Sequence, residues 1–378
     1  MDTRSPLHSF SDRLKQLIRE VSQRAFDPVS LDEGHFNELA RELFSYQVEA
    51  NSFLKLWVDR SGLDPSQVDR WEMIPCVPTD AFKEFSVTAL SESERTAVFR
   101  SSGTTQADRG QHFHSTASLE LYEASLLPWF QWHMGFGDHD RNQHSLVVLT
   151  PSGAEVPNSS LVHMFETAGK HGNYVECSVH GNIGSDGGWG LDGASLIATC
   201  QAAMESGHPV TMVGTAFNFV QLLDALSGAQ KTLRLPLGSC LLETGGYKGR
   251  TRELAKDDLY GRLERALGIP QGRMICEYGM CELSSQAYDR RLNDDGTFAQ
   301  ERRFQFPPWV RLRIVSPETG RSVEDGETGM IQIFDLANVW SALGIQTGDL
   351  GRLVEGRLEL LGRAEVADAK GCSLLAVN

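Results

Sequence analysis

Short apolar runs alternate with helical patterns from about residue 95 onward, and this alternation constrains the fold more than any other feature. Apolar runs without polar alternation are typical of parallel strands that are buried on both faces. The predicted strands are 146–150, 210–214, 239–244 and 274–278, and helical patterns between or before them include 119–127 and 217–226. Strands that alternate with helices predict an α/β body with a mostly parallel sheet.

The segment that precedes this body reads as helices followed by an arm. Capping-box spacing occurs at 9–12 and again at 30–33, each time ahead of apolar residues at helical intervals. Prolines punctuate the following segment, 74–83, and each proline biases its predecessor away from the α region. We therefore expect helices that bury one face, followed by a domain boundary or by an arm that wraps around the body.

The C-terminal part of the chain differs from both. Strand-like runs at 310–315, 330–334 and 358–361 are separated by turn-rich segments and not by helical patterns. Antiparallel β structure in a small lobe is the natural prediction. The predicted organisation is a helical region with a proline-rich arm over 1–95, an α/β core over 96–304 and a small β lobe with a tail over 305–378.

Composition excludes several classes of function. Asp and Glu number 50 against 35 Lys and Arg, a formal net charge of −15, so the surface would repel nucleic-acid phosphates and anionic membranes. No apolar stretch approaches the ~18 residues of a membrane span, and residues 1–6 lack the apolar core of a signal peptide. The seven cysteines are an odd number without a C-x-x-C pair, which argues against a disulfide framework. We expect a cytoplasmic protein without a nucleic-acid partner or a membrane span.

A hydroxyl-rich loop is the strongest local feature. Four hydroxyl side chains surround one glycine in the run Ser101, Ser102, Gly103, Thr104 and Thr105. The backbone amides of such a loop can turn inward while the hydroxyls donate to oxyanions, as a polyphosphate site requires. The loop is not a Walker A loop, because G-x-x-x-x-G-K-[ST] is absent. Solvated turns often share this composition, so phosphate binding is one of two interpretations.

A second motif follows the predicted strand 239–244. It contains Gly245, Gly246, Tyr247 and Lys248. Open α/β sheets form their ligand crevices at the carboxyl ends of strands, and glycines there let the backbone approach a flat ligand. The alternative interpretation is a loop that merely starts a helix.

Two more motifs occur further along the chain. Tyr278 and Gly279 are followed by Glu282, so that a tyrosine ring could stack on a base while a carboxylate ligates Mg²⁺. Asp349, in T-G-D, could accept hydrogen bonds from ribose hydroxyls, and Arg363, in G-R, could face a phosphate. A core tyrosine with a solvated glutamate, and ordinary turn chemistry, explain the same spacings.

The order of these motifs resembles that of the adenylate-forming superfamily of acyl-CoA synthetases and luciferases. S-S-G-T-T, G-G-Y, Y-G-M-C-E, T-G-D and G-R occur in this order. Within the superfamily, the chain is similar to the LuxE-type acyl-protein synthetases, the long-chain-fatty-acid ligases of bacterial luminescence. The narrower resemblance lies in I-P-x-x-P-T-D-A-F-K at 74–83, in E-T-G-G-Y-K-G-R at 243–250 and in Lys370-Gly371-Cys372, and it extends from about residue 70 to the end.

The resemblance implies a large adenylate-forming α/β domain that activates a carboxylic acid, by analogy a long-chain fatty acid, with ATP and Mg²⁺. It implies that Ser101 to Thr105 hold the phosphates and that Glu282 holds Mg²⁺. It implies ATP contacts from Gly245, Gly246, Tyr247, Tyr278, Gly279, Asp349 and Arg363, with Asp349 on the ribose. The segment Gly214, Thr215 and Phe217, at the end of another predicted strand, would form a wall of the acyl pocket, although a strand-to-helix turn needs no ligand to explain it.

The chain departs from the superfamily at several points. Gln106 and Cys281 replace the usual Gly and Thr, and Glu365 stands where Asp is common. Acyl-CoA synthetases continue beyond the G-R motif with a whole C-terminal lobe that supplies an adenylation lysine, whereas this sequence ends shortly after Arg363. We expect that lobe to be missing and its positive charge to come from the main body. The candidates are Lys83, Arg109, Lys248 and Arg250.

The tail suggests an acyl acceptor. Cys372 lies ten positions past Gly362, a reach of about 33–36 Å if extended, and Gly371 permits a bend. The resemblance implies the same role, since acyl-protein synthetases carry the acyl chain as a thioester on a cysteine of this region. Packing of Cys372 on the β lobe is the alternative.

The predicted function is therefore that of an acyl-protein synthetase which adenylates a fatty acid, captures the acyl group on Cys372 and passes it to a protein partner, by analogy an acyl reductase or an acyltransferase. Transfer to coenzyme A or to an acyl carrier protein is one alternative. A non-catalytic subunit of an acyl-transfer complex is another. A serine hydrolase is remote, because the chain has no G-x-S-x-G elbow.

Overall fold

The chain divides into two compact units, each built from segments that are distant in the sequence. The computed structural model describes residues 5–26, 31–101, 109–135, 143–245, 254–291 and 302–364. The first unit contains Met1–Pro128, Met280–Ala287 and Arg303–Asn378, and the second contains Trp129–Gly279 and Tyr288–Arg302. The N-terminal helices and the C-terminal strands, which we expected in separate segments, thus belong to the same unit.

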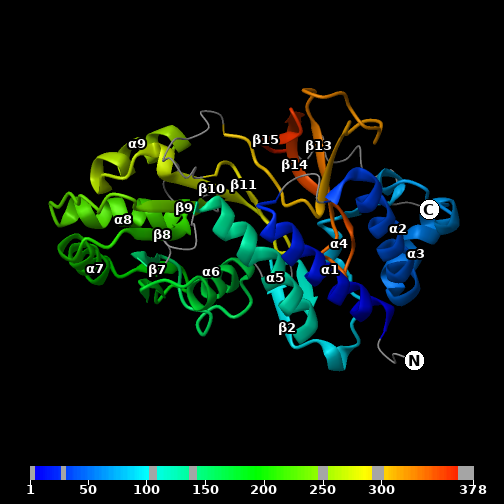
Figure 1. Cartoon of the computed structure of the whole chain (residues 1–378), viewed down its shortest axis with the longest axis horizontal. Coiled ribbons are helices and arrows are strands. Elements are labelled where there is room, and N and C mark those ends of the chain that lie inside the picture. Colours follow the sequence, from blue (N-terminus) through cyan, green and yellow to red (C-terminus); the bar gives the residue numbers. More distant parts are fainter. Residues whose placement is uncertain are drawn as a thin grey trace. The chain divides into compact units, whose positions relative to one another are not determined.

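The second unit is built around a parallel sheet, of which the strands β8, β9 and β10 are labelled in Figure 1. The strands pair in the order β10-β9-β8-β4-β5, and all of these pairs are parallel. Their bounds are β4 (Ser145–Val148), β5 (Glu176–Val179), β8 (Val210–Thr215), β9 (Cys240–Thr244) and β10 (Met274–Tyr278). The order reverses at β4, so the carboxyl ends of β4 and β8 flank the point where such sheets form their ligand crevice.

Helices follow the strands along the chain, as the alternation predicted. They are α6 (Ser160–His171), α7 (Gly193–Ser206), α8 (Ala216–Gly228) and α9 (Lys256–Leu267), and a small antiparallel hairpin is formed by β6 (Gly181–Ile183) and β7 (Trp189–Leu191). Every residue of β8, β9 and β10 is buried. The prediction of an α/β body with a mostly parallel sheet is confirmed, because four continuous apolar runs became neighbouring strands.

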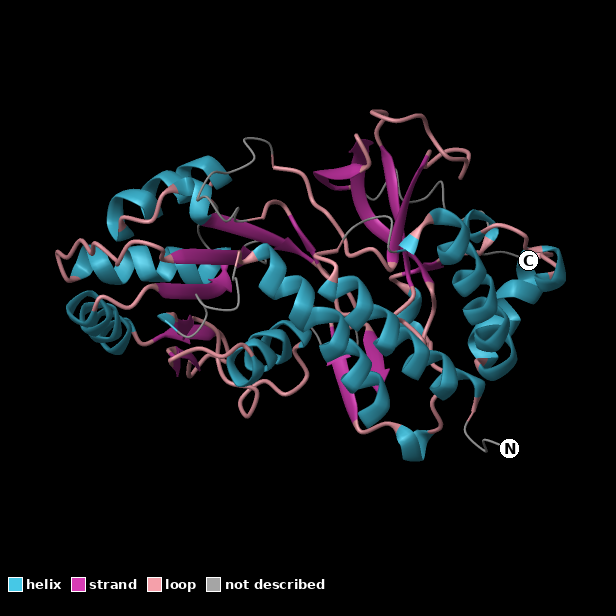
Figure 2. Cartoon of the chain, viewed as in Figure 1, coloured by secondary structure: helices cyan, strands magenta, loops and turns pink. Residues whose placement is uncertain are grey.

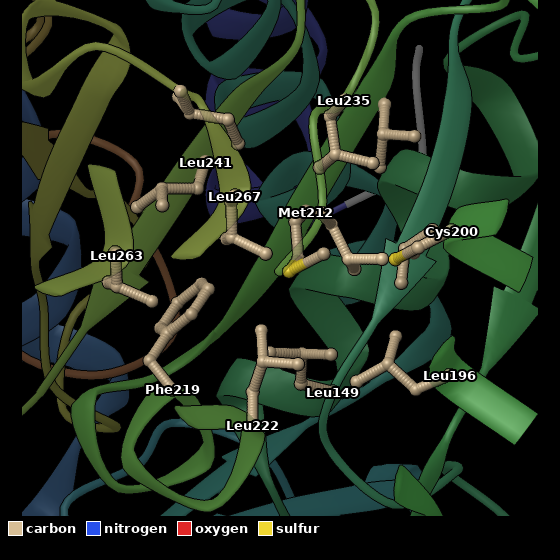
Figure 3. Packing of buried hydrophobic residues seen from close by; sticks show 14 of the residues in the cluster. Leu149, Leu196, Cys200, Met212, Phe219, Leu222, Leu235, Leu241, Leu263 and Leu267 are labelled. Carbon is tan, nitrogen blue, oxygen red and sulfur yellow. The ribbon is translucent and has the colours of Figure 1, made fainter. Parts of the chain in front are cut away.

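The hydrophobic core of the second unit lies between this sheet and its helices. Figure 3 shows Met212 and Leu241 from the sheet packed with Phe219 of α8 and Leu263 of α9. Phe219, Met212, Leu241 and Leu263 are fully buried. Burying such side chains contributes about 1.5–3 kcal/mol each relative to exposure, so the strand ends stand on a rigid layer.

The first unit contains an antiparallel sheet, and Figure 2 draws its strands in magenta like those of the second unit. Its strands are β12 (Val310–Val315), β13 (Gly329–Asp335), β14 (Gly344–Val354) and β15 (Arg357–Arg363), and β1 (Val77–Pro78) pairs with β14 in parallel. The predicted antiparallel strands are present. Because β1 belongs to the proline-rich segment, this segment is an arm built into the sheet and not a boundary.

Several helices and one hairpin complete the first unit. The helices are α1 (Pro6–Gln23), α2 (Glu33–Ala50), α3 (Ser52–Ser61) and the short α4 (Ala81–Glu84), and β2 (Ala97–Arg100) pairs with β3 (Gln111–His114). Two elements are divided between the two units, namely α5 (Thr116–His133), which follows β3 along the chain, and the two-residue strand β11 (Ala287–Tyr288). None of the helices in the described ranges combines the length and the apolar character that a membrane crossing needs.

The two predicted helix starts had different outcomes. α1 begins at Pro6, before the expected capping box, and Ser5 caps it by accepting a hydrogen bond from the His8 amide (3.4 Å). That prediction was wrong because proline is already organised for the first helical position. In α2, Asp32 is the cap and accepts from the His35 amide at 2.9 Å, within the segment that the sequence indicated.

Candidate functional site

The hairpin of β2 and β3 carries the start of the hydroxyl-rich loop in the first unit. Ser101 follows β2 and Gly110 precedes β3, and the two residues face each other across the hairpin. The Gly110 amide donates to Ser101 Oγ at 2.7 Å, and the Ser101 amide donates to the Gly110 carbonyl at 3.0 Å. The rest of the loop, Ser102 to Thr105, lies outside the described residues.

Glu282 lies against this hairpin. A Cβ atom added to Gly110 would lie 2.9 Å from Glu282 Oε1 and 3.2 Å from Ser101 Oγ. The carboxylate and the hydroxyl therefore share the space that the missing side chain of Gly110 leaves open. Two motifs that are far apart in the sequence meet at this point of the first unit.

The Glu282 carboxylate is buried and has cations nearby. The residue is 5% exposed, and this burial raises the pKa of its carboxyl group, while the positive charges of Lys83 and Arg363 lower it. Lys83 belongs to α4 and forms an ion pair with Asp80 at 2.6 Å. A buried carboxylate is suited to bind a divalent cation, and the two positive charges near it suit an anionic ligand such as a phosphate.

Cys281 and His112 form the buried side of this cluster. His112 Nδ1 donates to the Cys281 carbonyl at 2.8 Å, and burial lowers the pKa of His112 to about 4, so its ring is neutral near pH 7. Burial and the Glu282 charge raise the pKa of the Cys281 thiol well above its usual value. Cys281 is therefore a protonated packing group and a poor nucleophile.

Asp349 and Arg363 are paired across β14 and β15. They are register partners, and Arg363 Nε lies 3.4 Å from Asp349 Oδ1. The Asp349 side chain is 14% exposed, whereas that of Arg363 is 87% exposed. Thr347 Oγ1 accepts from the Asp349 amide at 3.1 Å and donates to the Ile331 carbonyl at 2.9 Å. The T-G-D motif is part of a strand and not the turn that its composition allowed.

The strand-end residues of the second unit lie in one row. Thr215, Thr244 and Glu277 are register partners at the carboxyl ends of β8, β9 and β10. Gly245 follows Thr244 with φ +65°, a conformation that favours glycine. Tyr278 is buried and Gly279 is exposed. Gly246, Tyr247 and Lys248 lie outside the described residues.

The candidate acyl-pocket residues have structural roles of their own. A Cβ atom on Gly214 would lie 2.9 Å from Leu149 Cβ, so close packing requires glycine there. Thr215 caps α8 in a capping box with Asn218, whose amide donates to Thr215 Oγ1 at 3.2 Å. Phe217 follows in α8 and is half-buried.

Buried charges of the second unit were not anticipated from the sequence. Thr244 Oγ1 donates to Glu277 Oε2, and burial raises the pKa of Glu277 to about 7. Glu243 Oε2 accepts from the Tyr260 hydroxyl at 3.0 Å and lies 3.6 Å from Lys256 Nζ. Glu243 lies two residues before Gly245, and Glu277 directly precedes Tyr278. This proximity to motif residues is the one signal in the sequence that could have indicated them.

Other contributors in the first unit were also missed. Gly110 and His112 lie at the return of the hydroxyl-rich loop, where a hairpin would bring them opposite its start. Asn338 binds the Glu282 carbonyl from 56 positions away, and no local pattern indicates it. Within the described ranges, no three His, Cys, Asp or Glu side chains are grouped as metal ligands. Cys372 lies outside these ranges.

Comparisons with known proteins agree on one family and one fold. The profile of the family described as "Acyl-protein synthetase, LuxE" matches residues 33–378. A long-chain-fatty-acid–luciferin-component ligase from Vibrio harveyi is 24% identical over 357 residues, which cover 89% of this chain and 86% of that protein. A protein of the same name from Aliivibrio fischeri is 33% identical over 85 residues, 20% of this chain and 22% of that protein.

Solved structures share the architecture. A 2-hydroxyisobutyryl-CoA ligase in the postadenylation state, in complex with 2-HIB-AMP, superposes with a TM-score of 0.65 at 14% identity, over 88% of this chain and 67% of that one. An open conformation of the ligase in complex with 2-HIB-AMP and CoA has the same TM-score, 0.65, at 15% identity, over 88% and 74% of the two chains. The fold is thus the adenylate-forming fold that the motif order indicated. With a profile match over most of its length, the chain belongs to the LuxE acyl-protein synthetase family.

Proposed function

We propose that this protein activates a long-chain fatty acid with ATP and transfers the acyl group to a protein thiol. In the first step, a carboxylate oxygen attacks the α-phosphorus, the bond to the β-phosphate breaks, and acyl-AMP and pyrophosphate form. In the second step, a thiolate attacks the acyl carbon, AMP leaves with the bonding electrons, and the thiol proton passes to solvent. The names of the two curated relatives support the fatty acid as substrate.

The observation that carries the proposal is the cluster in the first unit. Ser101, Glu282, Lys83 and the Asp349–Arg363 pair come from four sequence-distant segments, yet Glu282 interacts with both cations and lies against the Ser101 hairpin. A hydroxyl donor and two cations suit phosphate oxygens, and a half-enclosed carboxylate suits ribose hydroxyls. A purely structural cluster would have no need of an exposed arginine beside a buried glutamate.

The residues present fit a magnesium ion. Glu282 is a buried carboxylate whose burial raises its pKa, and binding a divalent cation would relieve that cost. Mg²⁺ at phosphate sites is usually held by one or two carboxylates and by the phosphates themselves, which suits a single Glu282. When bound, the ion would neutralise phosphate charge, while Lys83 and Arg363 would orient the phosphates and Ser101 would donate a hydrogen bond.

The remaining roles are proposed from the family resemblance. Gly245 and Tyr278 would bind the adenine, together with Gly246 and Tyr247, and Gly279 would also contact ATP. Gly214, Thr215 and Phe217 would line the acyl pocket, near the strand-order reversal where open sheets bind ligands. Lys248 would add positive charge, and Cys372 would accept the acyl group before an acyl reductase or acyltransferase takes it.

Acid-dependent ATP–pyrophosphate exchange tests the first step. We expect exchange that requires Mg²⁺ and rises with acyl length across a series of acids from short to long. Glu282→Gln should abolish it. A wild-type protein that shows no exchange with any acid, while remaining folded, would exclude the proposed activity.

Intact-mass analysis tests the second step. Cys372→Ser should preserve exchange and remove the covalent fatty-acyl adduct, whereas Cys177→Ser, at an exposed cysteine outside the proposed site, should retain it. An adduct that persists in Cys372→Ser would assign the acceptor to another group. Release of acyl-CoA instead of an adduct would identify coenzyme A as the acceptor.

A further inference from the structure

The segment that carries Glu282 is held by hydrogen bonds from the buried end of β13 and from the loop that follows it. Residues 336–343 connect β13 to β14. Asp335, the last residue of β13, and Asn338 of this loop are at most 1% exposed. Asp335 Oδ2 accepts from the Ser284 amide at 3.0 Å, and Asp335 Oδ1 accepts from Ser285 Oγ at 2.9 Å. The end of β13 and the segment that carries Glu282 are thereby joined just past Glu282, with Ser284 and Ser285 as the donors.

Asn338 makes the link to Glu282 itself. Its Nδ2 donates to the Glu282 carbonyl at 3.0 Å and to the Ala342 carbonyl at 3.1 Å. Its Oδ1 accepts from Ser284 Oγ at 2.7 Å. A single side chain therefore fixes the backbone of Glu282, the neighbouring serine and its own loop.

The loop is in turn anchored to a helix. Gln47 of α2 donates through Nε2 to the Asn338 carbonyl at 2.7 Å and accepts through Oε1 from the Leu343 amide at 3.0 Å. Gln47 is fully buried. Buried polar networks with satisfied members rigidify the segments that they join, so the position of Glu282 is set by a continuous chain of hydrogen bonds from α2.

We propose that Asn338 is a positioning residue for the Glu282 carboxylate and hence for the divalent ion of the adenylation step. The inference rests on the proposed function for its consequence in catalysis, but not for the positioning itself. Two devices act on Glu282 together: Asn338 holds its backbone, and Gly110 leaves room for its carboxylate. Neither Asn338 nor Ser284 needs to touch substrate for this role.

A matched pair of serine variants tests the proposal. Ser284→Ala and Ser341→Ala each remove one buried hydroxyl donor, but Ser284 Oγ bridges to Asn338, whereas Ser341 Oγ donates to the Val87 carbonyl at 2.9 Å. We expect Ser284→Ala to raise the Mg²⁺ concentration for half-maximal exchange by about fivefold, as the loss of one buried hydrogen bond implies. Ser341→Ala should leave it within about twofold of wild type, by the same reasoning.

Asn338→Ala is the stronger variant, and it removes the bond to the Glu282 carbonyl. We expect at least about a tenfold rise in the Mg²⁺ requirement, since an unpaired buried carbonyl costs more than a lost bond, with the KM for the acid unchanged. Should this variant fail to fold, the serine pair alone decides. Equal Mg²⁺ requirements in Ser284→Ala and Ser341→Ala would overturn the inference.

A second readout is independent of activity. Cys281 is 5% exposed and adjoins Glu282, so its rate of alkylation by iodoacetamide, followed by peptide mass analysis, reports on loosening of this segment. Ser284→Ala and Asn338→Ala should label faster than wild type, and Ser341→Ala should not. If wild type shows no exchange, the proposed function fails and labelling alone judges the positioning. Unchanged labelling in all three variants would then refute it.

Discussion

The two units hold buried carboxylates in different ways. In the second unit, Glu277 is held by Thr244, its register partner on the adjacent strand. In the first unit, Glu282 is reached by Asn338 and faces the hairpin at Gly110, both distant in the sequence. The carboxylate of the second unit is part of the sheet core, whereas that of the first lies beside cations. Burial alone therefore does not identify a functional carboxylate, and Glu282 is distinguished by a hydroxyl donor and two cations near it.

The largest expected effect contrasts Glu282→Gln with Glu277→Gln. Glu282→Gln should lower pyrophosphate exchange by about 100-fold or more, because it removes the charge that would bind the metal ion. Its thermal unfolding should stay close to that of wild type. Glu277→Gln should keep exchange within about fivefold, a difference that minor repositioning explains. Equal losses of exchange in the two variants would break the comparison.

The next effect concerns stability and pH in the second unit. Burial raises the pKa of Glu277 to about 7 from an unfolded value near 4.5, so the folded state binds its proton more tightly. This contribution is fully present below about pH 4.5 and is lost as pH rises through about 7, on the order of 3 kcal/mol in total. Denaturant titrations from pH 5 to 8 should show the decline, and Glu277→Gln should remove this part of it. If the unfolding free energy of Glu277→Gln fell with pH as steeply as that of wild type, another titrating group would be responsible for the fall.

A pair of glycines sharpens the comparison further. A Cβ atom at Gly110 or at Gly214 would lie 2.9 Å from a neighbouring side chain, Glu282 in the first case and Leu149 in the second. Gly110→Ala should displace a movable carboxylate and raise the Mg²⁺ requirement about tenfold, with little loss of stability. Gly214→Ala should crowd the core and cost about 1–3 kcal/mol of unfolding free energy. A large loss of stability in Gly110→Ala with an unchanged Mg²⁺ requirement would contradict this account of Gly110.

The smallest effect compares two lysines. Lys83→Gln should raise the KM for ATP by about tenfold, because one charge-assisted phosphate contact is lost, while Asp80→Asn should not raise it. Lys256→Gln, whose lysine lies 3.6 Å from Glu243, should instead lower the melting temperature with the KM unchanged. An unchanged KM for ATP in Lys83→Gln would show that Lys83 does not contact the phosphates and that other cations neutralise their charge.

The sequence predicted much of the fold where apolar runs were continuous. β10 and β12 occupy the residues that these runs indicated. β14 was missed as a strand, because Gly344, Gly348 and Asp349 give it low β propensity. Its pairing with β1, β13 and β15 overrides that propensity, and such pairing is not visible in a local pattern.

The motif residues of the site could be predicted from the sequence, but the residues that hold them by hydrogen bonds could not. The positions of Ser101, Glu282 and Asp349 were selected from motif order, which reflects the chemistry of a ligand. The side chains of Asn338 and Gln47 bind backbone carbonyl and amide groups, which every residue possesses, so no pattern in the sequence could have pointed to these contacts. The acyl acceptor Cys372 stays a prediction.

The pairing of β1 with β14 has a consequence for insertions and deletions. Val77 is aligned with Ile345, and Pro78 with Gln346. The positions of Lys83 and Asp349 are therefore both set by their distance along the chain from these paired residues. One residue added between Pro78 and Lys83 would shift the lysine by a step while the aspartate stayed in place. Length changes between Pro78 and Lys83 should therefore be rejected, because they would separate the lysine from the aspartate.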